Sequence, residues 1–502
     1  MSDLYNNLAL GFSVALTLHN VLYCLIGTLL GTLIGVLPGI GPVTTIAMLL
    51  PLTFKLEPTS SLIMLAGIYY GSQYGGSTTA ILVNLPGEAS SIVTTLDGYQ
   101  MARQGRAGEA LAVAALGSFF AGCVGTLLIA ASGPPLAKLA QQFGPAEYFS
   151  LMLLGLVASV VMASGSVVKA FAMVAVGVAL GLIGTDVDSG AMRYTFGIGE
   201  LSEGISFVAL AMGLFGIAEI LRNLMGDGEQ DRSVLDAKVT GLWPSAAVLR
   251  EATPAVLRGT ALGSAMGLLP GGGAVLASFA SYAMEKRMAA DPSRFGRGAL
   301  EGVAGPESAN NAAAQTSFIP MLTLGIPSNA VMALMVGAMI IQGIEPGPEV
   351  MSKRPDLFWG MVASMWLGTL MLVIINLPLI GIWAALLRVP YRLMYPAILL
   401  FCCIGVYTLN NSTFEVLLAA GFGLLGFALI HWGFEMTPLL LGFVLGPLME
   451  ENLRRAMRYA QGDPMVLVER PLSGALLAAS VVLLVIVLLP MIRRRREEVF
   501  AE

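Results

Sequence analysis

Residues 27–43 read GTLLGTLIGVLPGIGPV, and residues 259–275 read GTALGSAMGLLPGGGAV. The two segments align without gaps at an offset of 232, and ten of their seventeen positions are identical. In both, glycine recurs at every fourth residue of an apolar run, a spacing that lets helix backbones pack closely. Each run ends in a Pro-Gly-x-Gly break, whose freed backbone groups cannot face lipid and must face protein, water or ligand. The repeat therefore predicts two related halves, each built around a broken apolar hairpin.

Each half carries a second polar interruption further along the chain. The first is ILVNLPGEASS around Pro86, and the second is LTLGIPSNAV around Pro327, at an offset of 327 − 86 = 241. A fainter third pair comprises residues 210–224 and 439–453. The order of elements is therefore expected to be duplicated, with a broken helix following each hairpin.

The composition is that of a polytopic membrane protein. The 502 residues are 56% hydrophobic and only 12% charged, with a mean hydropathy of +0.79, against roughly 25% charged residues in an ordinary soluble domain. This excludes a cytosolic enzyme, and at ~20 residues per span it allows about ten to fourteen membrane segments. The few basic residues lie in short loops rather than in one patch, so no nucleic acid is expected as a partner. The four cysteines lack the spacing of a zinc or redox site and are interpreted as packing residues.

The distribution of lysine and arginine predicts the orientation, because basic residues in short loops mark the cytoplasmic side. Arg493–Arg496 follow the last apolar run and place the C-terminus inside, and the basic loop at residues 286–297 places the end of the second hairpin there too. Residues 256–285 are then predicted to enter and return on the cytoplasmic side. Five predicted crossings separate the hairpins, and this odd number makes the first hairpin enter from the opposite face. The predicted fold is an all-α polytopic membrane protein of two inverted repeats, each with a re-entrant hairpin and a broken helix.

The predicted domain boundaries follow from this scheme. The N-terminal stretch has no basic residue before its apolar run, so it lacks the positive region of a signal peptide and is expected to lie on the membrane surface. The expected parts are a first inverted repeat with this interfacial segment at 1–225, a cytoplasmic linker at 226–255, a second inverted repeat at 256–465, and a final transmembrane helix with a basic cytoplasmic tail at 466–502.

The hairpin tips are the predicted anion site. A helix that restarts after a break presents free N–H groups and the positive end of its dipole, which favour an anion. Thr44 and Thr45 follow the first tip, and the run GGST at 75–78 offers hydroxyls and permits close approach. A carboxylate can be held there without a fixed positive charge. The predicted substrate-binding residues are Pro38, Gly39, Gly41, Thr44, Thr45, Gly75, Gly76, Ser77, Thr78, Pro270, Gly271, Gly272, Gly273, Asn310, Asn311 and Thr316.

Two acidic residues are candidates for binding a coupling ion. Glu307 lies in GPESANNAAAQTS at 305–317, where the polarity indicates either ligand or ion coordination, or hydrogen bonding between helices. Glu88 is either a functional carboxylate in the membrane or a group exposed at the interface. Na⁺ and H⁺ both remain open as the coupling ion, and no other cofactor is expected. The predicted residues of the ion site or second break are Asn84, Pro86, Gly87, Glu88, Glu307, Pro327, Ser328 and Asn329.

Two further groups of polar residues receive structural interpretations. Asp186 and Asp188, in IGTDVDSG, fall in a loop at a membrane edge and are expected to form a solvated turn. His431, in ALIHWGFE, is interpreted as a helix-end histidine rather than a proton relay.

At these same breaks the chain resembles the large membrane subunit of the tripartite tricarboxylate transporters, the TctA family. The resemblance is carried by GVLPGIGPVTTIAMLLPLTF, IYYGSQYGGSTTAILVNLPGE, DGYQMARQGRAGEAL and FGRGALEGVAGPESANNAAAQTSFIPMLTLGIP. It implies gradient-driven uptake of tricarboxylates or related carboxylates across a bacterial inner membrane. It also implies two partners: a small membrane subunit (TctB-like) and a periplasmic solute-binding protein (TctC-like).

Two other classes of function remain as alternatives. A passive anion channel would be expected to show a ring of pore residues rather than hairpin tips. A membrane-embedded enzyme is disfavoured because the sequence has no GxxxxGK[ST], HExxH or GxSxG motif. The missing phosphate-binding loop also predicts that no nucleotide drives transport.

Overall fold

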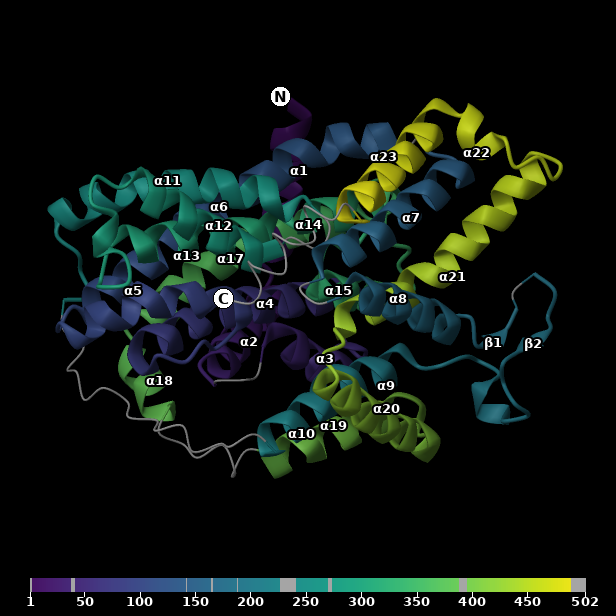
Figure 1. The fold of residues 1–502 in the computed structure, drawn as a ribbon, viewed down its shortest axis with the longest axis horizontal. Helices are drawn as coiled ribbons and strands as arrows, with labels where there is room; N and C mark the ends of the chain where they lie inside the picture. The colour runs from purple at the N-terminus through teal and green to yellow at the C-terminus, as the bar shows by residue number, and fades with distance from the viewer. Residues whose placement is uncertain are drawn as a thin grey trace.

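The computed structural model describes residues 2–37, 41–140, 142–163, 166–186, 188–225, 241–269, 273–387 and 395–488 (Figure 1). Within these ranges the chain is helical except for loops and one short antiparallel pairing, in which Gly184 lies opposite Arg193. The expected all-α class is therefore confirmed for the described part of the chain. The tip residues Pro38, Gly39, Pro270, Gly271 and Gly272 lie outside it.

The elements follow the order that the sequence repeat predicts. The first half contains α1 (Ser2–Ala15), α2 (Leu18–Gly35), α3 (Pro42–Thr53), α4 (Pro58–Val83), η1 (Ala89–Ser91), α5 (Ile92–Arg103), α6 (Ala107–Ala140), α7 (Pro145–Met162), α8 (Val167–Gly181), β1 (Gly184–Thr185), β2 (Met192–Arg193), η2 (Gly199–Leu201), α9 (Phe207–Ala211), the π-helix η3 (Met212–Ile217) and α10 (Ala218–Met225). The second half contains α11 (Ala246–Gly267), α12 (Gly273–Met288), η4 (Pro292–Arg294), α13 (Glu301–Thr316), α14 (Phe318–Leu324), α15 (Ala330–Ile341), α16 (Pro348–Lys353), α17 (Pro355–Asn376), α18 (Ile380–Leu386), α19 (Tyr395–Asn410), α20 (Thr413–His431), α21 (Met436–Tyr459), α22 (Val466–Glu469) and α23 (Pro471–Leu488).

The structure is that of a multi-pass membrane protein. Helices long and apolar enough to cross a membrane occur at Leu18–Gly35, Ala107–Leu136, Phe207–Met225, Pro355–Asn376 and Thr413–His431. Shorter apolar helices occur at Pro42–Thr53, Pro145–Val161, Val167–Gly181, Ala330–Ile341 and Pro471–Ile486. One boundary differs from expectation: α11 begins at Ala246, inside the expected linker, because the Ser245 hydroxyl caps it by accepting from the Val248 N–H.

Glycine rows join each hairpin to the broken helix of its own half. Along α2 and α11, every fourth residue is a glycine whose added Cβ would lie under 3.0 Å from the backbone of the facing helix. Gly27, Gly31 and Gly35 face Met64, Ile68 and Ser72 of α4, and Gly259, Gly263 and Gly267 face Gly305, Ala309 and Ala313 of α13. The partners are separated by 305 − 64 = 241, which is also the offset of the break prolines. The expectation that these rows serve close helix packing is confirmed.

Corresponding residues end and restart the helix at the two breaks around Pro86 and Pro327. Asn84 ends α4 and Gly325 ends α14, each in the left-handed conformation, with φ of 59° and 75°. The N-cap residues that follow are Glu88, at the start of η1, and Asn329, whose Oδ1 accepts from the Met332 N–H. Side-chain capping and left-handed residues satisfy backbone groups that a break leaves free. The two breaks are thus built alike.

α21 of the second half and η3 of the first half each pack against a helix pair of the other half. α21 lies on α7 and α8, where Gly177 meets the backbone of Leu439, and η3 lies on α20, where Gly213 meets Ala419. In Figure 1 the first of these groups lies on the right, and the second, with α9, α10, α19 and α20, lies at the bottom. The fainter pairing of residues 210–224 with 439–453 thus corresponds to equivalent positions in the packing.

Two polar helices occupy the interior. All residues of α4 from Thr59 to Leu82 are buried, and so are all residues of α13 from Gly302 to Thr316. Both helices carry hydroxyl and amide side chains, α13 also carries the acidic Glu307, and other helices cover both. Polar groups enclosed in this way need partners inside the protein, and their arrangement defines the candidate site.

Candidate functional site

Glu307 connects α13 to both segments of the first half's broken helix. Its side chain is 1% exposed. One carboxylate oxygen accepts from the Ser77 hydroxyl of α4 at 2.6 Å, and the other accepts from the Thr94 hydroxyl of α5. The structure therefore brings together Glu307 and Ser77, which the sequence assigned separately to an ion site and a substrate site.

Glu88 enters the same region from the break around Pro86. It is buried, accepts from the Ser90 hydroxyl, and lies 3.5 Å from Nδ2 of Asn310. An added Cβ at Gly76 would lie 2.7 Å from Cγ of Glu88, so the glycine gives this side chain its room. Asn310 is one helical turn from Glu307, and Gly76 is adjacent to Ser77, so the two carboxylates approach the α4–α13 contact together. Of the two interpretations of Glu88, exposure at an interface is excluded, because Gly76 and α13 cover the side chain.

The partners of both carboxylates are neutral. In the part of the chain that the structure describes, hydroxyls and an amide bond to Glu88 and Glu307, and neither carboxylate forms an ion pair. A buried carboxylate without a counter-charge is strongly disfavoured and takes up a proton or another cation. The site therefore has the chemistry of a cation-binding centre.

The second arm of each hairpin packs against the helix that follows the break of the other half, which lies around Pro86 in the first half and around Pro327 in the second. α12, the second arm of the second hairpin, packs on η1, and α3, the second arm of the first hairpin, packs on α15. An added Cβ at Gly273 would lie 3.8 Å from Nδ2 of Asn329, so the start of α12 also adjoins the break around Pro327. Gly41 has no neighbour within 4 Å of an added Cβ.

Several predicted substrate ligands form hydrogen bonds to the backbone. The Thr44 hydroxyl donates to the carbonyl of Phe215 in η3 at 2.8 Å, and the Thr45 hydroxyl donates to the Gly41 carbonyl at 3.0 Å. The Thr316 hydroxyl donates to the Ala312 carbonyl beside Gly267, which places it in the α11–α13 contact.

The other predicted residues pack against neighbouring segments or form hydrogen bonds with nearby residues. Asn311 donates to Ser118 of α6 at 2.8 Å, and the Ser328 hydroxyl donates to the Ser317 carbonyl at 3.4 Å. Gly87 packs under Gly35, and Gly75 packs on Thr32. Pro86 and Pro327 are the prolines of the breaks, and Thr78 donates to the Tyr74 carbonyl at 3.2 Å.

Sequence reasoning missed residues that complete the site. Ser90 also lies 2.9 Å from Oε1 of Gln73, and Thr94 bonds to Glu307 from α5. The sequence held a signal for Ser90 and Thr94, because both follow the break around Pro86 within the same polar stretch. The partner of Thr94 lies 213 residues away along the chain, so only the fold reveals the contact of Thr94 with α13.

Asp97 was also missed, and it ties the two halves together. Its buried Oδ1 accepts from the backbone N–H groups of Gly296, Gly298 and Ala299 at 2.9, 2.8 and 2.8 Å. Its Oδ2 accepts from the Tyr282 hydroxyl at 2.9 Å. Four donors on one carboxylate fix α5 against the loop between α12 and α13.

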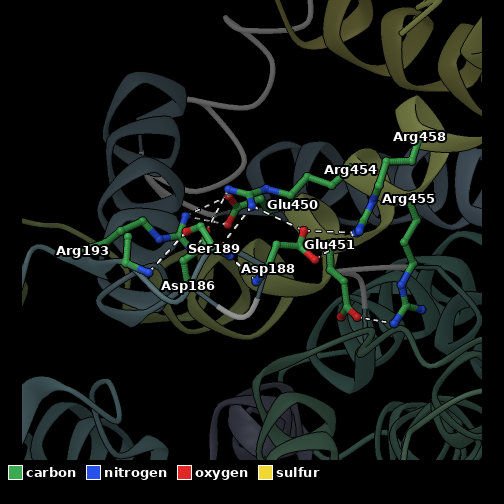
Figure 2. Close-up of polar contacts among 10 residues, drawn as sticks. Asp186, Asp188, Ser189, Arg193, Glu450, Glu451, Arg454, Arg455 and Arg458 are labelled. Atoms are coloured by element: carbon green, nitrogen blue, oxygen red, sulfur yellow. Dashed lines mark hydrogen bonds and ion pairs between the residues drawn. The ribbon is translucent and has the colours of Figure 1, made fainter. Parts of the chain in front are cut away.

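The loop around Asp186 differs from the predicted solvated turn. Asp186 is 3% exposed and accepts from the Ser189 N–H at 2.8 Å. It also pairs with Arg193 at 3.1 Å and with Arg454 of α21 at 2.9 Å, as Figure 2 shows. The Ser189 N–H, and then the Ser189 hydroxyl and the two guanidinium groups, hold the pKa of Asp186 well below its ordinary value. The turn exists, but Asp186 is a buried ion-pair partner because α21 covers it.

Asp188 and Glu450 complete this cluster. Asp188, which is more exposed, pairs with Arg458 at 3.0 Å, and Glu450 pairs with Arg193 at 2.8 Å. Glu451 pairs separately with Arg455, one turn along α21 (Figure 2). The cluster fastens the β1–β2 loop to the end of α21.

Comparisons with known proteins identify relatives of the chain. The family described as "Tripartite tricarboxylate transporter TctA family" matches residues 21–441. An uncharacterised 52.8 kDa protein from the TAR-I ttuC' 3' region of Agrobacterium vitis is 61% identical over 502 residues, which are 100% of both chains. An uncharacterised protein from the TAR-II ttuC' 3' region of the same organism is 59% identical over 240 residues, which are 48% of this chain and 99% of the relative. No solved structure matches the chain.

Proposed function

Because the chain belongs to the tripartite tricarboxylate transporter TctA family, we propose that it is the large membrane subunit of a gradient-driven system for uptake of tricarboxylates or related carboxylates. The observation that carries this proposal is the approach of Glu88, at the break around Pro86, to Asn310 of α13, one helical turn from Glu307, which bonds to Ser77 of α4. Broken helices that meet inside a membrane protein are a recurring design of substrate and ion sites in secondary transporters.

Coupling follows from the charges of this site. A carboxylate substrate held near Glu88 and Glu307 is repelled while both are ionised. A proton or metal cation bound beside them removes the repulsion, so each ligand raises the affinity for the other. In this mechanism the substrate anion is held by backbone N–H groups at the starts of α3 and α12.

The membrane arrangement and the partners complete the proposal. The two halves are inverted repeats whose re-entrant hairpins enter from opposite faces of the bacterial inner membrane, with the C-terminus in the cytoplasm. A periplasmic solute-binding protein delivers the substrate, and a small membrane subunit completes the transporter. The basic loops and the duplicated helix packing support this arrangement.

The test is uptake of mono-, di- and tricarboxylates, driven by an imposed ion gradient, in proteoliposomes that contain the chain and its two partners. Concentration of one carboxylate class against its gradient, abolished by ionophores while ATP remains, is the expected result. Movement that only equilibrates the substrate indicates the passive anion channel instead. Uptake that persists after all ion gradients are removed contradicts the proposal.

A further inference from the structure

A small cavity between α4, α6 and α17 lies beside Glu307. Its polar lining comes from Tyr74, Ser77 and Thr78 of α4, Ser118 of α6 and Asn376 of α17. It has room for about one water molecule. Ser77 belongs both to this lining and to the hydrogen bond with Glu307 at 2.6 Å.

The hydroxyl protons of the lining residues are used elsewhere. Ser77 donates to the Glu307 carboxylate, Thr78 to the Tyr74 carbonyl at 3.2 Å, and Ser118 to the Glu307 carbonyl at 3.4 Å. The Tyr74 hydroxyl donates to the Ala115 carbonyl at 3.4 Å. Carbonyl oxygens and an ionised carboxylate only accept, so these bonds run from the hydroxyls while Glu307 is ionised. The hydroxyl oxygens of Tyr74, Ser77 and Thr78 therefore offer lone pairs rather than protons to the cavity, whereas the Ser118 oxygen already accepts from Asn311 at 2.8 Å.

Asn376 adds an acceptor of the same kind. Its Nδ2 donates to the Leu372 carbonyl at 2.9 Å and to the Thr32 hydroxyl oxygen at 3.4 Å, which assigns the other amide atom as Oδ1. Asn376 is 4% exposed, and Oδ1 has no hydrogen-bond partner. A buried polar atom of this kind points to a missing ligand.

We propose that this cavity binds a dehydrated monovalent cation of the size of Na⁺, with Glu307 as its counter-charge. A water molecule donates only two hydrogen bonds and would find no donor here, whereas a cation uses every acceptor. Divalent cations prefer several carboxylate ligands, and the described residues include no cluster of three acidic, histidine or cysteine side chains that could hold a metal ion. One positive charge also balances the one carboxylate that touches the lining.

The role of this cation site rests on the proposed transport function, whereas the test of cation binding does not depend on it. Among the charged groups, Glu307 is hydrogen-bonded to Ser77, a residue of the cavity lining.

The test is thermal unfolding of the purified assembly, titrated with NaCl at constant ionic strength against choline and KCl. Na⁺ should raise the unfolding temperature of the parent in a saturable way, because a ligand that binds only the folded state stabilises it. Asn376→Leu and Thr78→Val should each raise the Na⁺ midpoint by about tenfold, since each removes one oxygen ligand. Thr126→Val is the matched control, because Thr126 is a buried helical threonine that bonds to its own helix at Gly122, away from the cavity. It should leave the Na⁺ midpoint unchanged.

Transport then separates the two proposals. In proteoliposomes, a Na⁺ gradient should drive carboxylate uptake in the parent, and the Asn376 and Thr78 variants should need about tenfold more Na⁺. If carboxylates move but neither unfolding nor uptake responds to Na⁺, the cavity holds only water and this inference is overturned while the transport function stands. If Na⁺ stabilises the parent but no carboxylate moves, the site stands and the transport function fails. An equal Na⁺ midpoint in the parent and in both cavity variants also overturns the site.

Discussion

At the scale of single residues, Asp186 shows how one side chain can hold a loop. The sequence marks it as a turn former, and its Oδ1 does accept from the Ser189 N–H. Its second role depends on Arg454, which lies in a helix of the other half. Pairs between exposed charges contribute little, whereas a pair that is largely covered and hydrogen-bonded to backbone contributes more.

Asp186→Asn should lower the unfolding temperature of the detergent-purified protein, because it removes the charge that holds Arg193 and Arg454. The native pKa of Asp186 is lowered, so its stabilising contribution is complete above the unfolded pKa and is lost as the pH falls through the native value. The difference in unfolding temperature between parent and variant should therefore be constant from about pH 7 to about pH 5 and shrink only below about pH 4.

The control for this experiment is Asp463→Asn, since Asp463 is exposed and bonds to the Met465 N–H. It should show a smaller effect at neutral pH. A difference for Asp186→Asn that already disappears near pH 6 would contradict the assigned role.

At the scale of elements, the glycine rows decide which helices meet. Gly263 lies so close to Ala309 that an added Cβ would come under 3.0 Å from the backbone of α13. Backbone atoms cannot move aside without displacing the whole helix. The rows therefore require glycine for a steric reason that can be tested directly.

Gly263→Ala should reduce the free energy of unfolding by at least about 2 kcal/mol, because the new methyl group overpacks the α11–α13 contact. Gly421→Ala is the matched control, since Gly421 lies in α20 with no neighbour within 4 Å of an added Cβ. Its effect should stay within about 0.5 kcal/mol. Unfolding in denaturant, with insertion measured in the same membranes, gives both values, and equal effects at the two glycines would refute the packing argument.

The sequence predicted these elements better than it predicted their neighbours. The glycine rows, both breaks and the polar helix at Glu307 follow from spacing and composition, because helix period and break chemistry are local properties. The bonds of Glu307 to Ser77 and Thr94, and the clamp on Asp97, join residues about two hundred positions apart. Such contacts depend on how the halves pack, which no local pattern contains.

At the scale of the whole molecule, the inverted arrangement of the two halves and the direction of insertion remain predictions. In a background with its four cysteines replaced, Glu57→Cys should react with an impermeant thiol reagent from the periplasmic side, and Arg294→Cys only after the membrane is opened. Both positions are exposed and lie at opposite predicted faces. Labelling of both from one side would exclude inverted repeats.

Helices of each half pack against helices of the other half, and this has a consequence for the synthesis of the protein. η3 emerges from the ribosome early, but its partners α19 and α20 begin only at residue 395. At usual rates of translation this gap lasts roughly 10 to 30 s. During that interval the first half sits in the membrane with Gly213 and its neighbours turned toward lipid or a chaperone. The packing around η3 is therefore completed only when the last third of the chain has been made.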